Sequence, residues 1–183
     1  MNALTITGII LAVIALFIIF LYNSLIRLKN QVKNSWAQID VQLKRRTDLI
    51  PNLVESVKGY MKHEKSVLEN ITKARSAMMK ADTIEGKAKA SNMLSQTLKS
   101  LFAVSENYPQ LKANENFLQL QEEITGTENK IAYSRQHYND MVMRFNIKIE
   151  TFPNNQLNKF LHFTKEQQFE AAAGERKNVK VKF

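Results

Sequence analysis

One stretch near the N-terminus constrains this chain more than any other. It runs from Leu4 to Tyr22, 19 residues without a charged side chain, and only Thr5, Thr7 and Gly8 weaken its apolar character. As a helix, with a rise of about 1.5 Å per residue, it would be about 28 Å long, close to the ~30 Å hydrocarbon core of a bilayer. Helices in soluble cores are rarely apolar on every face. The stretch therefore predicts a single transmembrane helix.

The flanks of this stretch predict an uncleaved anchor and its orientation. No basic residue precedes Leu4, and no small-residue cleavage pattern follows Tyr22, so a secretory signal peptide is disfavoured. Arg27, Lys29 and Lys33 follow within the flank that sets topology. The positive-inside rule then predicts a single-pass cell-membrane protein with its N-terminus outside and the rest of the chain in the cytoplasm.

Beyond the anchor, large residues recur with alternating spacings of four and three. The pattern consists of Val32, Trp36, Ile39, Leu43, Arg46, Ile50, Leu53, Val57 and Tyr60. This is the seam of a helix that packs on another helix at a shallow angle, as in a coiled coil. Pro51 removes a helical hydrogen bond and predicts a kink near Asp48 or a break.

The rest of the chain also favours helices, because it contains only 5 Gly and 3 Pro. Apolar periodicity predicts helices over 66–80, 88–104 and 114–149, with a loop at 81–86 and an end or kink at Pro109. The last helix carries its own seam, formed by Phe117, Leu120, Ile124, Thr127, Ile131, Ser134, Tyr138, Met141, Phe145 and Ile149. Short connections between helices predict antiparallel neighbours.

The predicted fold is all-α: a transmembrane helix that continues into an antiparallel four-helix bundle with long first and last helices. The anchor occupies residues 1–24, the bundle residues 25–152, and an amphipathic and extended tail residues 153–183. Within the tail, Phe160 and its neighbours could bind the inner leaflet or pack across the end of the bundle, and both interpretations stay open. The alternating residues Val179 to Phe183 are typical of an extended segment or edge strand.

The antiparallel register predicts a polar level inside the bundle. It places Arg46 opposite Thr127 and Glu128, and a buried guanidinium needs a carboxylate or must reach solvent. We expect a buried polar cluster of Arg46, Glu128, Asp48 and Arg135, with outward snorkelling of Arg46 as the alternative. Such a cluster more often fixes register than performs chemistry.

The same register sets Trp36 opposite His137.

No catalytic, cofactor or metal site is expected. The three histidines, His63, His137 and His162, lie on different predicted elements, and there is no Cys. The glycines are isolated, so no phosphate-binding loop exists. The net charge of +9 leaves an anionic partner open. Arg45 and Arg46 lack interleaved aromatic residues, which argues against nucleic acid.

Several runs resemble one family. They are Arg45 to Val54 with Asp40 to Lys44 before it, Tyr108 to Ala113, Thr127 to Ala132, and Phe169 to Ala171. Together they resemble the LemA family of bacterial membrane-anchored helical proteins, over roughly residues 25–183. The chain departs from that pattern at Val179 and Lys182. The resemblance implies the same fold class and a structural or organising role.

We therefore expect a non-enzymatic scaffold that is anchored in the bilayer. This scaffold either forms homo-oligomers or organises partners or membrane at the inner leaflet. One alternative is an adaptor or regulator of another membrane protein, such as a protease or a signalling complex. Another is a membrane-tethered nucleic-acid binder.

Overall fold

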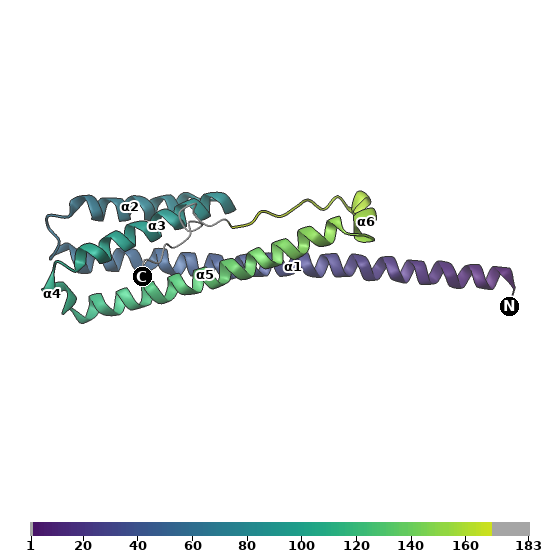
Figure 1. The fold of residues 1–183 in the computed structure, drawn as a ribbon, viewed down its shortest axis with the longest axis horizontal. Coiled ribbons are helices and arrows are strands. Elements are labelled where there is room, and N and C mark those ends of the chain that lie inside the picture. The colour runs from purple at the N-terminus through teal and green to yellow at the C-terminus, as the bar shows by residue number, and fades with distance from the viewer. Residues whose placement is uncertain (1, 170–183) are drawn as a thin grey trace, which may run out of the picture. The chain divides into compact units, whose positions relative to one another are not determined.

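The computed structural model describes residues 2–169, and all regular structure in this part of the chain is helical (Figure 1). The helices are α1 (Ala3–Lys58), α2 (Lys65–Lys80), α3 (Ile84–Ser105), α4 (Pro109–Lys112), α5 (Glu115–Glu150) and α6 (Asn154–Leu161). The all-α prediction is confirmed. The extended segment predicted for Val179 to Phe183 lies outside the described residues.

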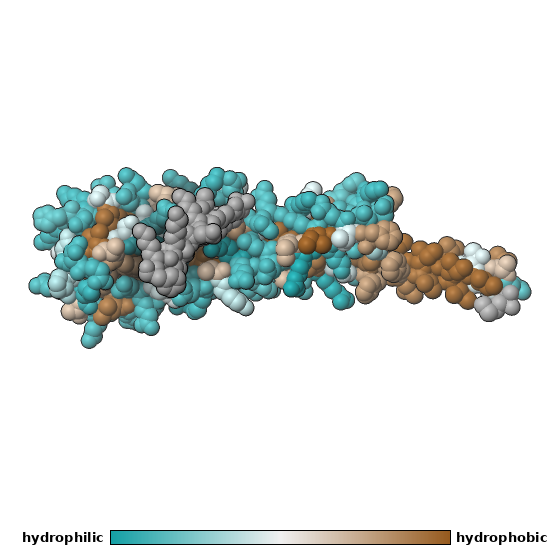
Figure 2. Space-filling model, viewed as in Figure 1, coloured by the Kyte–Doolittle hydropathy of each residue, from teal (hydrophilic) through white to brown (hydrophobic). Residues whose placement is uncertain are grey.

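The N-terminal part of α1 is apolar and carries no packing partner within the described residues. It contains the one described window long and apolar enough to cross a membrane, and none of that window is buried. In Figure 2 this end of α1 is a continuous hydrophobic surface, without the hydrophilic residues that cover much of the remaining surface. The sequence-based prediction of a candidate membrane helix therefore agrees with the structure.

The predicted break at Pro51 is not observed, because α1 runs through Pro51 to Lys58. Proline cannot donate to the carbonyl four residues back, which here belongs to Thr47. Arg75 of α2 donates its Nε–H to that carbonyl oxygen over 3.2 Å. A side chain from a neighbouring helix thus satisfies the acceptor that Pro51 leaves free.

Pro109 separates two helices instead of kinking one. α3 ends at Ser105, and Pro109 opens α4, where a missing N–H costs no helical hydrogen bond. The predicted loop at 81–86 is shorter in the structure, since Thr83 caps α3 by accepting from the Gly86 N–H over 3.0 Å. The Asn114 side chain likewise accepts from the Phe117 N–H at the start of α5.

The described residues divide into two compact units. Unit 1 contains residues 2–37 and 136–168, and unit 2 contains residues 38–135 and Phe169. Helices α1 and α5 each contribute to both units.

Unit 2 has a hydrophobic core to which five helices or their flanks contribute. Its buried members are Ile50, Leu53, Val57, Met61, Ile71, Ala74, Leu94, Leu98, Leu101, Leu111, Phe117 and Ile124. The seam prediction was wrong at its last position: Tyr60 is 38% exposed, and Met61 is buried instead. Because α1 ends at Lys58, the heptad spacing no longer applies to these two residues.

Aromatic and polar contacts hold the segments of unit 1 together. Trp36 of α1 packs against Tyr138 of α5 with ring centroids 5.5 Å apart, whereas His137, the predicted neighbour, is exposed. Asn146 binds the extended segment after α6, donating to the Glu166 carbonyl and accepting from the Glu166 N–H, each over 2.9 Å. The segment that follows α6 is thereby held on α5.

Candidate functional site

The most unusual side chain of unit 2 is Arg46, which has no exposed surface. It occupies a seam position of α1, between the buried residues Leu43 and Ile50. The helical period therefore turns its guanidinium inward together with the apolar seam. A fully buried arginine needs partners for its charge and its N–H groups.

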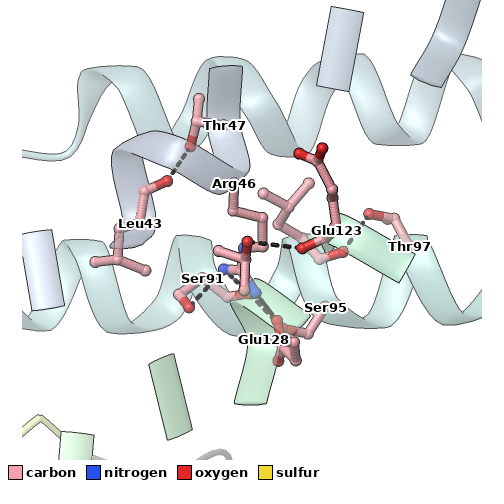
Figure 3. Close-up of polar contacts among 10 residues, drawn as sticks. Leu43, Arg46, Thr47, Ser91, Ser95, Thr97, Glu123 and Glu128 are labelled. Atoms are coloured by element: carbon pink, nitrogen blue, oxygen red, sulfur yellow. Dashed lines mark hydrogen bonds and ion pairs between the residues drawn. The ribbon is translucent and has the colours of Figure 1, made fainter. Parts of the chain in front are cut away.

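Three side chains from two other helices surround the Arg46 guanidinium (Figure 3). Nη1 donates to Ser95 Oγ over 2.9 Å and forms an ion pair with Glu128. Nη2 donates to Ser91 Oγ over 2.8 Å and to the Ser91 carbonyl over 3.3 Å. Ser95 in turn donates to Glu128 Oε1 over 2.7 Å. We call Arg46, Ser91, Ser95 and Glu128 the arginine network; it links α1, α3 and α5.

Burial lowers the pKa of the Arg46 guanidinium from its ordinary value, and the nearby Glu128 carboxylate opposes that change. Arginine remains protonated in proteins, so the site holds a fixed positive charge. Glu128 is 40% exposed, and water therefore reaches the carboxylate end of the pair. The Arg46 Nε–H has no hydrogen-bond partner among the described residues. The network is thus a packed polar contact between α1, α3 and α5.

Of the polar cluster predicted from the sequence, the structure brings together Arg46 and Glu128. Asp48 is exposed and makes none of the contacts to Arg46 within the described residues. Arg135 is half-buried on α5, two helical turns beyond Glu128, and is not part of the network. Asp48 is only two residues from Arg46 but faces the other side of α1, and Arg135 lies about 10 Å along α5 from Glu128.

Sequence reasoning missed Ser91 and Ser95. Ser91 precedes the apolar positions Leu94, Leu98 and Leu101 of α3 and is buried at 4% exposure, and Ser95 follows one helical turn later. The available signal was a serine at heptad spacing before an apolar seam, together with one charged seam position elsewhere in the chain.

The residues predicted to set topology lie in unit 1. Arg27 and Lys33 are exposed, and Lys29 Nζ lies 5.0 Å from the centroid of the Phe163 ring. Tyr22, at the end of the apolar stretch, is 42% exposed. At the other end of that stretch Leu4 is exposed as well.

Within residues 2–169, no group of His, Asp and Glu side chains is arranged to hold a metal ion.

A family model described as the LemA family matches residues 35–183. This chain belongs to the LemA family. Protein LemA of Metamycoplasma hominis is 30% identical over 158 residues, which is 86% of this chain and 72% of that protein. The resemblance predicted from Arg45 to Val54 and the other runs is confirmed. The four residues of the arginine network lie inside the family match, and the apolar part of α1 precedes it.

Proposed function

We propose that this LemA-family protein is a non-enzymatic scaffold anchored in the cell membrane, which self-associates or organises partners at the inner leaflet. One observation carries the proposal: α1 is a single helix from Ala3 to Lys58. Its first part is apolar and unburied, and its last turns belong to the core of unit 2. A chain built in this way presents a folded helical unit on a membrane-spanning helix.

The same proposal includes an antiparallel four-helix bundle formed by α1, α2, α3 and α5. All four helices contribute to the core of unit 2, which supports this architecture. Two contacts support the antiparallel register of α1 and α5. Arg46 pairs with Glu128, whereas Tyr60, later in the chain, accepts a hydrogen bond from Asn114, earlier in the chain.

The proposed topology places the N-terminus outside and unit 2 in the cytoplasm. It rests on Arg27, Lys29 and Lys33, which follow the apolar stretch directly. Anchoring confines all copies of the chain to one plane. This confinement raises their effective concentration and favours weak lateral contacts.

Self-association can be tested by cysteine crosslinking, because the natural chain contains no Cys. Tyr133 of α5 is 76% exposed, so Tyr133→Cys places a thiol on the surface at little cost to folding. We expect oxidation of membranes that contain this variant to yield a disulfide-linked dimer. The matched control is Ile131→Cys, whose side chain is 3% exposed and should not crosslink.

Light scattering of the detergent-solubilised full chain measures its oligomeric state. A monomer at every concentration, together with no crosslinked dimer in membranes, would contradict the self-associating scaffold. Crosslinks in cells to a different membrane protein would instead support the adaptor function.

A further inference from the structure

An open pocket lies in unit 1, close in the chain to the end of the apolar stretch. Its lining consists of Leu28, Arg144, Ile147, Lys148, Thr151 and Asn154. The link to the anchor is direct, since Lys148 Nζ donates to Ser24 Oγ over 2.8 Å. Ser24 is two residues beyond Tyr22, where the apolar stretch ends.

The position along α1 places this pocket at a defined depth, provided that the proposed anchor spans a membrane. From Tyr22 to Leu28 a helix rises about 9 Å. The headgroup regions add roughly 5–8 Å on each side of the ~30 Å hydrocarbon core. Ser24 and Leu28 would therefore lie within or at the edge of the headgroup layer.

Two cations border the pocket without a carboxylate to neutralise them. Arg144 and Lys148 are one helical turn apart on α5, so their side chains share a face. Neither forms an ion pair with a side chain of residues 2–169. Lys148 uses one of its three N–H groups on Ser24 and keeps two for a ligand. Such a pair matches a phosphate group, to which arginine can donate two parallel hydrogen bonds.

A polar group and an apolar rim complete the lining. Asn154 is 5% exposed, and its side-chain oxygen has no hydrogen-bond partner in the described part of the chain. That oxygen would accept from a headgroup hydroxyl. Ile147, in the lining, is 52% exposed, and Phe152 and Phe160, on either side of Asn154 in the sequence, are 80% and 81% exposed. Phe is among the residues that interfacial helices bury at the boundary between headgroups and acyl chains.

We propose that this pocket binds the headgroup of an anionic phospholipid, with Arg144 and Lys148 on the phosphate and Asn154 on a headgroup hydroxyl. The inference rests on the proposed membrane anchor and adds a lipid class to it. The two cations, the unpaired amide oxygen and the exposed aromatic residues all lie within reach of the layer that contains such lipids. A negatively charged protein surface would match the cations but would not explain Phe152 and Phe160 at this level.

The test uses the full-length chain in detergent, titrated with phosphatidylglycerol, with phosphatidylcholine, or with inorganic phosphate, and analysed by native mass spectrometry. We expect phosphatidylglycerol to bind more tightly than phosphatidylcholine. In Arg144→Gln/Lys148→Gln its dissociation constant should rise about thirtyfold, the usual effect of two basic side chains at an anionic lipid surface. Arg144→Lys/Lys148→Arg keeps both charges and should retain the preference.

A charge-matched control is Lys99→Gln/Lys130→Gln, which removes two exposed cations from unit 2 and should leave lipid binding unchanged. Equal loss in both double variants, or no preference in the unmodified chain, would overturn the site. Displacement of the lipid by equimolar inorganic phosphate would assign the pocket to free phosphate instead. Circular dichroism verifies that each variant is folded.

Membrane retention separates the two proposals. If alkaline carbonate releases the unmodified chain from membranes, the anchor itself is wrong. If the chain is retained but does not prefer phosphatidylglycerol, only the lipid site is wrong.

Discussion

Val13 and Val41 are the same residue type on the same helix with nearly the same exposure, 60% and 62%. Their surroundings differ completely. Val13 lies among side chains that are apolar on all faces of α1, whereas Val41 is a single exposed apolar residue on a helix whose opposite face is buried. Exposed valines scattered singly are normal on a protein surface in water. A helix that is apolar and exposed on every face is not normal in water. The two parts of α1 are therefore suited to different solvents.

The comparison shows why residue exposure alone does not identify a membrane helix. The part of α1 that contains Val41 buries a seam, including Ile39 and Leu43, and leaves polar residues outside. The part that contains Val13 has no seam and no buried residue in its apolar window, as expected of a helix whose faces would all contact a bilayer.

Charges placed in the apolar part should abolish insertion. Ile14→Arg/Ile18→Arg should disfavour membrane insertion by about 5–7 kcal/mol, since each arginine near the centre of a span costs roughly 2.5–3.5 kcal/mol. Fractionation of cells measures the loss of membrane-bound protein. Val41→Arg is the control and should stay in the membrane fraction. Retention of the double variant would show that α1 does not span the bilayer.

The part of α1 in the core of unit 2 contains the buried charge of Arg46. Removing its partner, Glu128, should destabilise the fold more than removing Arg46 itself. Glu128→Gln should destabilise the fold by about 3 kcal/mol, because it leaves Arg46 buried without a counter-ion, and exposure of Glu128 moderates the effect. Arg46→Met should cost less than about 1 kcal/mol, because it removes the buried charge and keeps the volume. Denaturant unfolding followed by circular dichroism measures both.

The double variant Arg46→Met/Glu128→Gln should resemble Arg46→Met alone. If Arg46→Met proves the more damaging of the two single variants, the network stabilises through its hydrogen bonds to Ser91 and Ser95 and not through charge compensation.

Unit 1 should lose stability at high pH. Burial, with a contribution from the Glu166 charge, raises the pKa of Tyr138 to about 12 from its ordinary value of 10. Between those values the unfolded chain releases the phenolic proton while the folded chain keeps it, so stability falls as pH rises, by roughly 2 to 3 kcal/mol. Below pH 10 the neutral phenol imposes no such penalty. Circular dichroism with denaturant at pH 9, 10.5 and 12 measures the slope.

In Tyr138→Phe that slope should be shallower than in the unmodified chain. The variant also loses the hydrogen bond from the Tyr138 hydroxyl to the Gln167 carbonyl, 2.7 Å long, at a cost of about 1 kcal/mol at every pH. Identical slopes in the two proteins would contradict the assignment to Tyr138.

The smallest expected effect is a gain. A Cβ at Gly126 in α5 meets no atom within 4 Å, so Gly126→Ala should stabilise unit 2 by about 1 kcal/mol through helix propensity. Gly8 has the same free space, yet it lies in the apolar part of α1. Gly8→Ala should therefore leave denaturant unfolding of unit 2 unchanged. An equal gain from both substitutions would show that the apolar part of α1 and unit 2 unfold in the same solvent.

Sequence periodicity predicted the parts of this fold that repeat. Heptad spacing identified most of the buried residues of α1 and α5, although it missed Leu25 and Val142. The register derived from it brought Arg46 to Glu128 and Trp36 within one residue of its partner, Tyr138. Hydropathy alone identified the candidate membrane helix. These signals are strong because each is carried by many residues at once.

Contacts made by single residues were not predictable in the same way. The carbonyl left free by Pro51 is satisfied by Arg75, which lies on another helix, so no local rule could show that α1 continues. Asn146 binds the backbone of Glu166, and nothing in the pattern of either segment marks that pair. Such contacts depend on tertiary placement, which a periodic pattern does not specify.

Val13 and Val41 test directly whether α1 crosses from a bilayer into water. Val13→Cys and Val41→Cys each introduce the only thiol of the chain. In native membranes treated with a water-soluble maleimide, we predict rapid labelling at position 41 and no labelling at position 13. In intact cells, position 41 should react only after permeabilisation, as expected for a cytoplasmic unit 2. Equal labelling at the two positions would contradict the claim.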